Sequence, residues 1–112
     1  MENNKQEFFD FLDVRKEEVL NEVKELSEDG RNDESNIAKA KANIYDIAKA
    51  FYGAAEKVAA PDGIVENFKS KFGNMANQWR TALEKAKEHD DSYKVLIEEA
   101  KLSAVTEIME KL

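Results

Sequence analysis

Apolar residues recur along most of this chain at alternating steps of three and four. The clearest run lies between residues 37 and 58 and consists of Ile37, Ala40, Ile44, Ile47, Phe51, Ala54 and Val58. Such steps place side chains on one face of an α-helix, whereas the side chains of a strand repeat every two residues. The pattern therefore predicts a helix over residues 34–59 whose apolar face packs against other helices.

The same spacing predicts three further helices, over residues 5–28, 61–87 and 92–111. The apolar face of the first comprises Phe9, Leu12, Val19, Val23 and Leu26, and that of the third comprises Val65, Phe68, Phe72, Met75, Trp79, Ala82 and Ala86. The last helix has two roughly opposite apolar stripes: Tyr93, Ile97, Ala100, Ala104 and Ile108, and Val95, Leu102, Val105, Met109 and Leu112. A helix that is apolar on more than one side is usually more buried than its neighbours.

Polar segments separate the four predicted helices, and each boundary holds residues suited to start or end a helix. These are Asn4 with Glu7 and Gly30 for the first helix, Asp33 or Ser35 for the second, Pro61 or Asp62 for the third, and Asp90, Asp91 or Ser92 for the fourth. Short connections between helices of similar length favour antiparallel neighbours. We therefore expect one all-α domain over residues 1–112, an antiparallel up-down-up-down four-helix bundle.

This topology predicts which apolar residues meet at each end of the bundle. One end should collect Phe8, Phe9, Phe51, Phe68, Met109 and Leu112. The other end should collect Leu26, Ile37, Leu83 and Leu96. Trp79 lies on the apolar face of the third helix, so we expect it in the core rather than at a binding surface.

Charged residues are unevenly distributed along the chain. Residues 1–34 contain twelve Asp or Glu and five Lys or Arg, whereas residues 35–112 contain twelve of each. The first third of the chain therefore accounts for the whole net charge of −7. An acidic chain is poorly suited to binding the phosphates of nucleic acids or an anionic membrane surface, so we expect neither as a partner.

The chain has no cysteine, which excludes disulfides and sulfur-based zinc sites and fits a reducing compartment. Its first residues lack the basic and apolar regions of a signal peptide. The chain also contains no run of 18 consecutive apolar residues, the length needed to span a bilayer. We expect a soluble cytoplasmic protein, and the composition gives the impression of a bacterial one.

No pattern typical of an active site or a cofactor site stands out. The single histidine, His89, lies in a polar loop and has no Glu three residues before it, unlike the metal-binding pairs of helical bundles. The spacing around Gly30 fits a calcium loop only in part, because Asn36 stands where a bidentate Glu is required. No glycine-rich phosphate loop is present. We therefore expect no catalytic, cofactor-binding or metal-binding residues and no enzyme.

Three groups of apolar residues exceed what a minimal bundle needs and could contact a partner. They are Phe11 and Val14 on the first helix, Tyr45 and Tyr52 on the second, and Val95, Leu102, Val105 and Met109 on the last. Packing within the chain is the alternative for each group, and tyrosine in particular suits the boundary between core and water. The form of association that we favour is a twofold dimer through the last helix, alone or with the first.

The leading interpretation is a noncatalytic protein–protein interaction module that binds a protein partner or a second copy of itself. The alternative is an acidic inhibitor or nucleic-acid mimic that binds a basic protein through the first helix. Its acidic residues would be Glu17, Glu18, Glu22, Glu25, Glu28 and Asp29. An enzyme would need a polar cavity with converging groups, which a sequence does not reveal.

Overall fold

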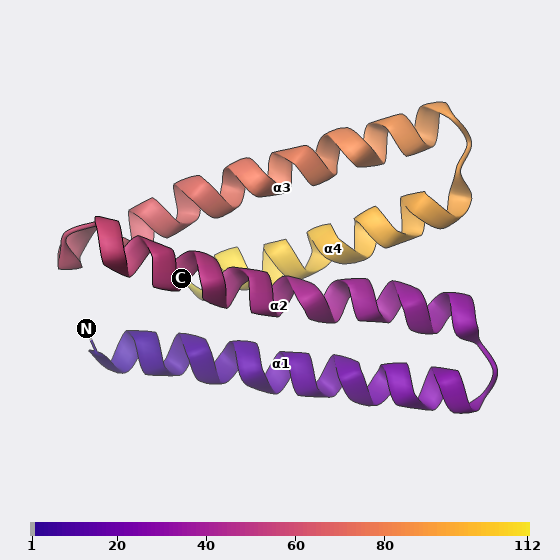
Figure 1. Ribbon diagram of the computed structural model, residues 1–112, viewed down its shortest axis with the longest axis horizontal. Coiled ribbons are helices and arrows are strands. Elements are labelled where there is room, and N and C mark those ends of the chain that lie inside the picture. Colours follow the sequence, from indigo (N-terminus) through magenta and orange to yellow (C-terminus); the bar gives the residue numbers. More distant parts are fainter. Residues whose placement is uncertain (1) are drawn as a thin grey trace.

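The computed structural model describes residues 2–112, with side chains from Lys5 onward. These residues form four α-helices: α1 (Glu2–Glu28), α2 (Asn32–Val58), α3 (Ile64–Glu88) and α4 (Ser92–Lys111). A 3₁₀ turn, η1 (Pro61–Gly63), connects α2 to α3. Successive helices run in opposite directions (Figure 1), so the predicted all-α, up-down-up-down bundle is confirmed.

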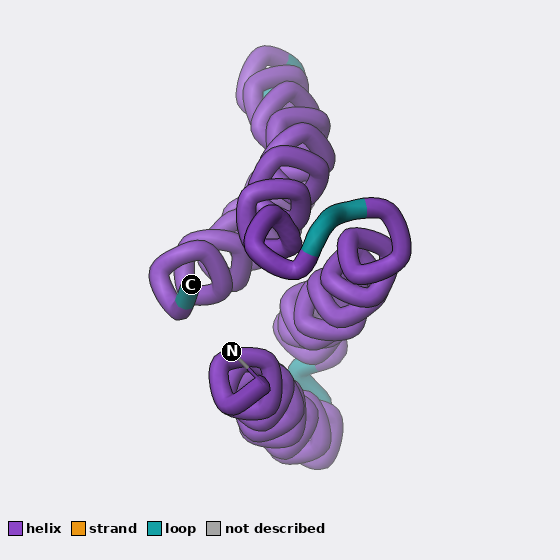
Figure 2. The backbone as a smooth tube through the Cα atoms, turned by 90° about the vertical axis from the view of Figure 1, so that its left-hand side faces the viewer, coloured by secondary structure: helices purple, strands orange, loops and turns teal. Residues whose placement is uncertain are grey.

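The bundle is flattened rather than square in cross-section. α2 packs against all three other helices, and α4 packs against α2 and α3, whereas α1 rests mainly on α2. Viewed along the bundle, α2 and α4 lie between α1 and α3 (Figure 2). The Cα trace accordingly measures 45 × 32 × 19 Å along its principal axes. Fully buried Ala48 and Ala104 suit this arrangement, because small side chains allow helices to approach closely.

The two helical hairpins diverge toward one end. The connection between α1 and α2 and the connection between α3 and α4 lie well apart in Figure 1. We call this the open end of the bundle. At the opposite, closed end, η1 and the two chain termini lie closer together.

Aromatic side chains fill the closed end, as the sequence predicts. The ring centroids of Phe8 and Phe68 are 5.6 Å apart, those of Phe8 and Tyr52 are 5.4 Å apart, and those of Phe68 and Phe72 are 5.1 Å apart. These four residues are buried. Phe9 and Phe51 are half-buried against this core. Aromatic contacts at such distances contribute about 0.5–1.5 kcal/mol each beyond the burial of area.

The buried face of α2 differs from the predicted one. Val58 is 74% exposed and Ala54 is exposed, although both belong to the predicted apolar face. Tyr45, Tyr52 and Ala55 are buried instead. The reason is that α2 contacts three helices rather than two, which shifts and widens the face that it buries.

Related backbone turns end both α1 and α3. After α1, Arg31 N–H donates to the Leu26 carbonyl and Gly30 adopts a φ of +74°. After α3, Asp91 N–H donates to the Ala86 carbonyl, and the left-handed residue is Asp90, with a φ of +54°. Both are Schellman motifs, and Gly30 terminates its helix as predicted.

Some predicted helix starts are wrong. α1 begins at Glu2, so Asn4 lies inside its first turn rather than at a cap, and the Asn4 side chain lies outside the described residues. α2 begins at Asn32, and Arg31, at the cap position, makes no side-chain cap bond. Ser35 lies inside the helix, and its hydroxyl bonds to the Ser27 hydroxyl at 2.8 Å. η1 and Gly63, rather than Asp62, precede α3. Asp91 caps α4 as predicted and accepts a hydrogen bond from Lys94 N–H.

Ion pairs between α1 and α2 line their exposed boundary. Lys16 pairs with Asp46 at 2.9 Å, and Lys49 pairs with Asp13 at 3.0 Å. Exposed pairs of this kind contribute about 0–1 kcal/mol each. Of the two pairs, only that of Lys49 with Asp13 neutralises an acidic residue of the first third of the chain.

Candidate protein-interaction groove

The structure places the predicted partner residues of α1 in two different environments. Val14 is 58% exposed on the outer side of α1. Phe11 is half-buried against the core, and the Lys111 ammonium group lies 5.4 Å from its ring centroid. Phe11 therefore packs near the end of α4, which is the alternative that the sequence left open, whereas Val14 remains accessible.

Tyr45 and Tyr52 do not lie on the surface. They are 1% and 6% exposed, and each joins the hydrophobic core. The sequence places them beside the apolar face of α2, but the buried face of that helix includes them because α2 contacts three helices. Their burial favours the alternative that the sequence left open, packing within the chain, and places both residues deeper than the boundary between core and water.

The second apolar stripe of α4 is also largely covered. Val105 is 2% exposed, and Leu102 and Met109 are half-buried against the core. The covering is possible because α4 lies between α2 and α3, and Met109 reaches to within 3.7 Å of the position that a Cβ would occupy on Gly73 of α3. Val95, nearer the open end, is half-buried. The stripe therefore offers little of the surface that a dimer through it would require.

Apolar residues remain accessible in a groove at the open end, which we call the open-end groove. It has a volume of about 490 Å³ and lies between the α1–α2 hairpin and α4. Its apolar lining consists of Leu26, Ile37, Ala38, Leu96 and Ala100. Leu96 is 51% exposed, whereas Leu26 and Ile37 are half-buried. The sequence predicts that these three residues share one end of the bundle, and the divergence of the hairpins leaves them lining a groove instead of a closed core.

Three charged residues also line the open-end groove: Glu22, Glu34 and Lys41. Lys41 Nζ lies 3.2 Å from a carboxylate oxygen of Glu107, and Glu34 pairs with Arg31. Among residues 5–112, Glu22 takes part in no ion pair. The groove therefore combines an apolar lining with one uncompensated negative charge.

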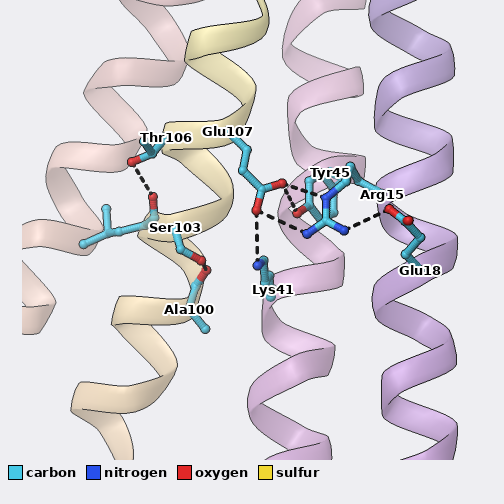
Figure 3. Close-up of polar contacts among 9 residues, drawn as sticks. Arg15, Glu18, Lys41, Tyr45, Ala100, Ser103, Thr106 and Glu107 are labelled. Carbon is cyan, nitrogen blue, oxygen red and sulfur yellow. Dashed lines mark hydrogen bonds and ion pairs between the residues drawn. The ribbon is translucent and has the colours of Figure 1, made fainter.

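A polar network joins α1, α2 and α4 beside this groove (Figure 3). Arg15 Nε donates to Glu107 at 2.8 Å, and a second guanidinium nitrogen donates to the other carboxylate oxygen at 3.2 Å. The Tyr45 hydroxyl donates to Glu107 at 2.8 Å. With Lys41, three donors from two helices therefore converge on the one carboxylate of α4.

The network changes the pKa values of its members. Burial by itself would raise the pKa of Glu107, but hydrogen bonds from Arg15, Tyr45 and Lys41 outweigh it and lower the pKa from 4.5 to about 2. Burial and the hydrogen bond to Glu107 raise the pKa of Tyr45. Glu107 is thus held as a carboxylate and Tyr45 as a neutral hydroxyl, which suits a structural tie rather than a group that exchanges protons.

The charged positions of this network carry no periodic apolar signal, so hydrophobic periodicity does not reveal them. Arg15 and Glu107 are 92 residues apart, and their pairing depends on how α4 lies across the α1–α2 hairpin. A charged residue on a helix that is apolar on two sides is the one available signal, and Glu107 fits it. Glu98 of α4 fits it as well, since it is 3% exposed and pairs with Lys101 at 3.1 Å.

Outside the groove and the network, the described residues contain few groups that could bind a ligand or take part in a reaction. No three His, Cys, Asp or Glu side chains among them gather into a metal site. Further hollows include one at the closed end, about 230 Å³ in volume, lined by Phe8, Tyr52 and Leu112 with the charged Glu7 and Lys111. Another, of about 380 Å³, lies between α2 and α3 and is lined by Phe51, Ala54 and Val58 with Asn67 and Lys71. Every buried side-chain polar atom in the described part of the chain has a hydrogen-bond partner.

The helices in the described range are too polar or too short to cross a membrane. Comparisons with family models, with curated proteins and with solved structures found no match for the chain.

Proposed function

We propose that this chain is a noncatalytic interaction module that binds another protein, either a distinct partner or a second copy, through the open-end groove. The observation that carries this proposal is the exposure of Leu96, at 51%, in a groove that three helices line with further apolar residues. Accessible apolar surface of this kind often marks a site of protein association. The burial of Val105 moves the proposed surface away from the second stripe of α4.

Two measurements test the proposal with one pair of variants. Leu96→Gln removes the most exposed apolar residue of the groove, and Val58→Gln is the control because Val58 is 74% exposed but lies outside the groove. Light scattering after size exclusion tests self-association, with a mass of twice 12.8 kDa expected for a dimer. Affinity retention on the immobilised chain tests for a distinct partner.

The expected result is an association that Leu96→Gln weakens and Val58→Gln preserves. A chain that stays monomeric at high concentration, and whose retained proteins are the same for all three forms, would refute the proposed function. Both variants should fold normally, because the replaced side chains lie largely in water.

A second candidate function is an acidic inhibitor or nucleic-acid mimic that binds a basic protein through α1. The supporting observation is that Glu17, Glu18, Glu22, Glu25, Glu28 and Asp29 are all exposed. Binding of this type would weaken steeply with salt and with Glu17→Lys, and would be indifferent to Leu96→Gln. Failure to bind basic nucleic-acid enzymes at low salt would remove this candidate.

A further inference from the structure

The two sides of the open-end groove differ in charge, and this difference bears on what it binds. Glu22 lines the side formed by α1, whereas the residues that α4 contributes, Leu96 and Ala100, are neutral. Lys41, which also lines the groove, pairs with Glu107 at 3.2 Å, and Glu34 pairs with Arg31. A ligand in the groove would therefore meet apolar side chains and an unpaired negative charge on the α1 side.

The surrounding surface extends this negative charge. Residues 1–34 carry the entire net charge of −7, and Glu18 and Glu25, close to Glu22 along α1, are exposed. Glu18 pairs with Arg15 at 2.9 Å, but Glu22 and Glu25 take part in no ion pair among residues 5–112. Positively charged residues on a ligand would gain from this field, because complementary potentials favour association and select partners.

The helical walls of the groove favour a helix as the ligand. They belong to α1, α2 and α4, so a further helix packed against them would continue the helix-on-helix packing of the bundle. The described residues form no β-sheet, so there is no sheet edge to which a partner could add a strand. Helix-in-groove recognition requires an apolar stripe on the ligand that matches an apolar floor.

We propose that the open-end groove binds an amphipathic helix of a basic partner protein. The apolar face of that helix would contact Leu26, Ile37 and Leu96, and its Lys or Arg residues would face Glu22. This inference rests on the proposed function and narrows it to one kind of partner.

A second copy of this chain is a poorer ligand for electrostatic reasons. A twofold interface uses the same surface on both subunits, so each copy would bring its own acidic α1 wall to the contact. With no basic residue available at the groove other than Lys41, like charges would then oppose association.

The test uses two synthetic peptides of about 18 residues, roughly 27 Å long as helices. Both carry leucine along one helical face, and the other face carries lysine in one peptide and glutamate in the other. Fluorescence anisotropy at about 0.15 M salt, where exposed charges are well screened, measures their affinity for the full chain. We expect the lysine peptide to bind at least about tenfold more tightly than the glutamate peptide.

Matched variants assign the binding to the groove. Leu96→Gln should weaken the binding of the lysine peptide by about five- to tenfold, because it removes apolar contact area without changing charge. Glu22→Lys should weaken it by about threefold or more, whereas Glu17→Lys, on the same helix but outside the groove, should change it by less than about twofold. Val58→Gln is the matched control for Leu96→Gln. Circular dichroism establishes that each variant remains helical.

Three results would overturn the inference: no binding of the lysine peptide, equal binding of both peptides, or equal loss in the groove and control variants, which would indicate nonspecific attraction to an acidic chain. The proposed function is tested separately. A dimer that Leu96→Gln dissociates, in a chain that does not bind the lysine peptide, would preserve the interaction module and refute the basic partner.

Discussion

The network around Glu107 makes a quantitative prediction about stability. Replacing Glu107 with Gln keeps the shape of the side chain but removes the charge that Arg15, Lys41 and Tyr45 stabilise at 2.8–3.2 Å. It also leaves the two cations without their shared partner. We therefore expect Glu107→Gln to weaken the attachment of α4 to the α1–α2 hairpin and to lower the free energy of unfolding.

The size of the effect follows from the pKa of Glu107. A decrease from 4.5 to about 2 on folding corresponds to about 3 kcal/mol of stability when the carboxylate is charged. Because the side chain is 30% exposed, solvent screening reduces the expected loss to about 1–2 kcal/mol. A loss of that size lowers the melting temperature of a domain of this length by about 4–10 °C.

The effect should depend on pH in a defined direction. A carboxyl group whose pKa is lowered by folding contributes its full stability above the unfolded pKa of 4.5, and loses that contribution as the pH falls toward about 2. The difference in stability between the wild type and Glu107→Gln should therefore be largest at neutral pH and shrink steadily below about pH 4.5.

Urea unfolding followed by circular dichroism at several pH values measures this difference. Glu110→Gln is the control, because Glu110 is an exposed residue of the same helix that forms no ion pair among the described side chains. It should change stability by no more than about 0.5 kcal/mol. The reasoning is refuted if Glu107→Gln matches the wild type at pH 7, or if its deficit is the same at pH 7 and at pH 2.5.

Further predictions concern the turns, the core and the groove. Asp90→Gly should stabilise the chain by about 0.5–1 kcal/mol in urea unfolding, because glycine adopts the φ of +54° without a Cβ penalty. Gly30→Ala should destabilise it by about 1 kcal/mol, because alanine at a φ of +74° incurs that penalty. Tyr45→Phe should cost about 0.5–1.5 kcal/mol by removing the hydrogen bond to Glu107, and an unchanged melting temperature would contradict this. Val105→Glu should cost about 3 kcal/mol or more, whereas Leu96→Gln should cost no more than about 0.5 kcal/mol, and thermal melts compare the two.

The open-end groove shows that residues can meet where the sequence predicts and still form a surface rather than a core. The bundle topology predicts that Leu26, Ile37 and Leu96 meet at one end, and all three line the open-end groove. Periodicity places Leu26 and Ile37 on the apolar faces of their helices, and the order of the helices places Leu96 at the same end. Neither contains information on the angle between the two hairpins. That angle decides whether they form a closed core or a surface.

The buried faces of α2 and α4 also depend on the arrangement of the helices, which local periodicity does not specify. Their apolar patterns are clear in the sequence, yet Tyr45 and Val105, predicted as candidates for the surface, are buried. The number of helices in contact determines the width of the buried face, and α2 contacts all three other helices. The pairing of Arg15 with Glu107 depends on the same arrangement.

Local periodicity, turn residues and short connections are enough to predict the number of helices, the approximate bounds of each and their antiparallel order. The central position of α2 and α4, the divergence of the hairpins and the exposure of Leu96 depend instead on how the helices pack. These features depend on contacts between residues far apart in the chain, where small side chains such as Ala48 and Ala104 allow an approach that no local pattern specifies.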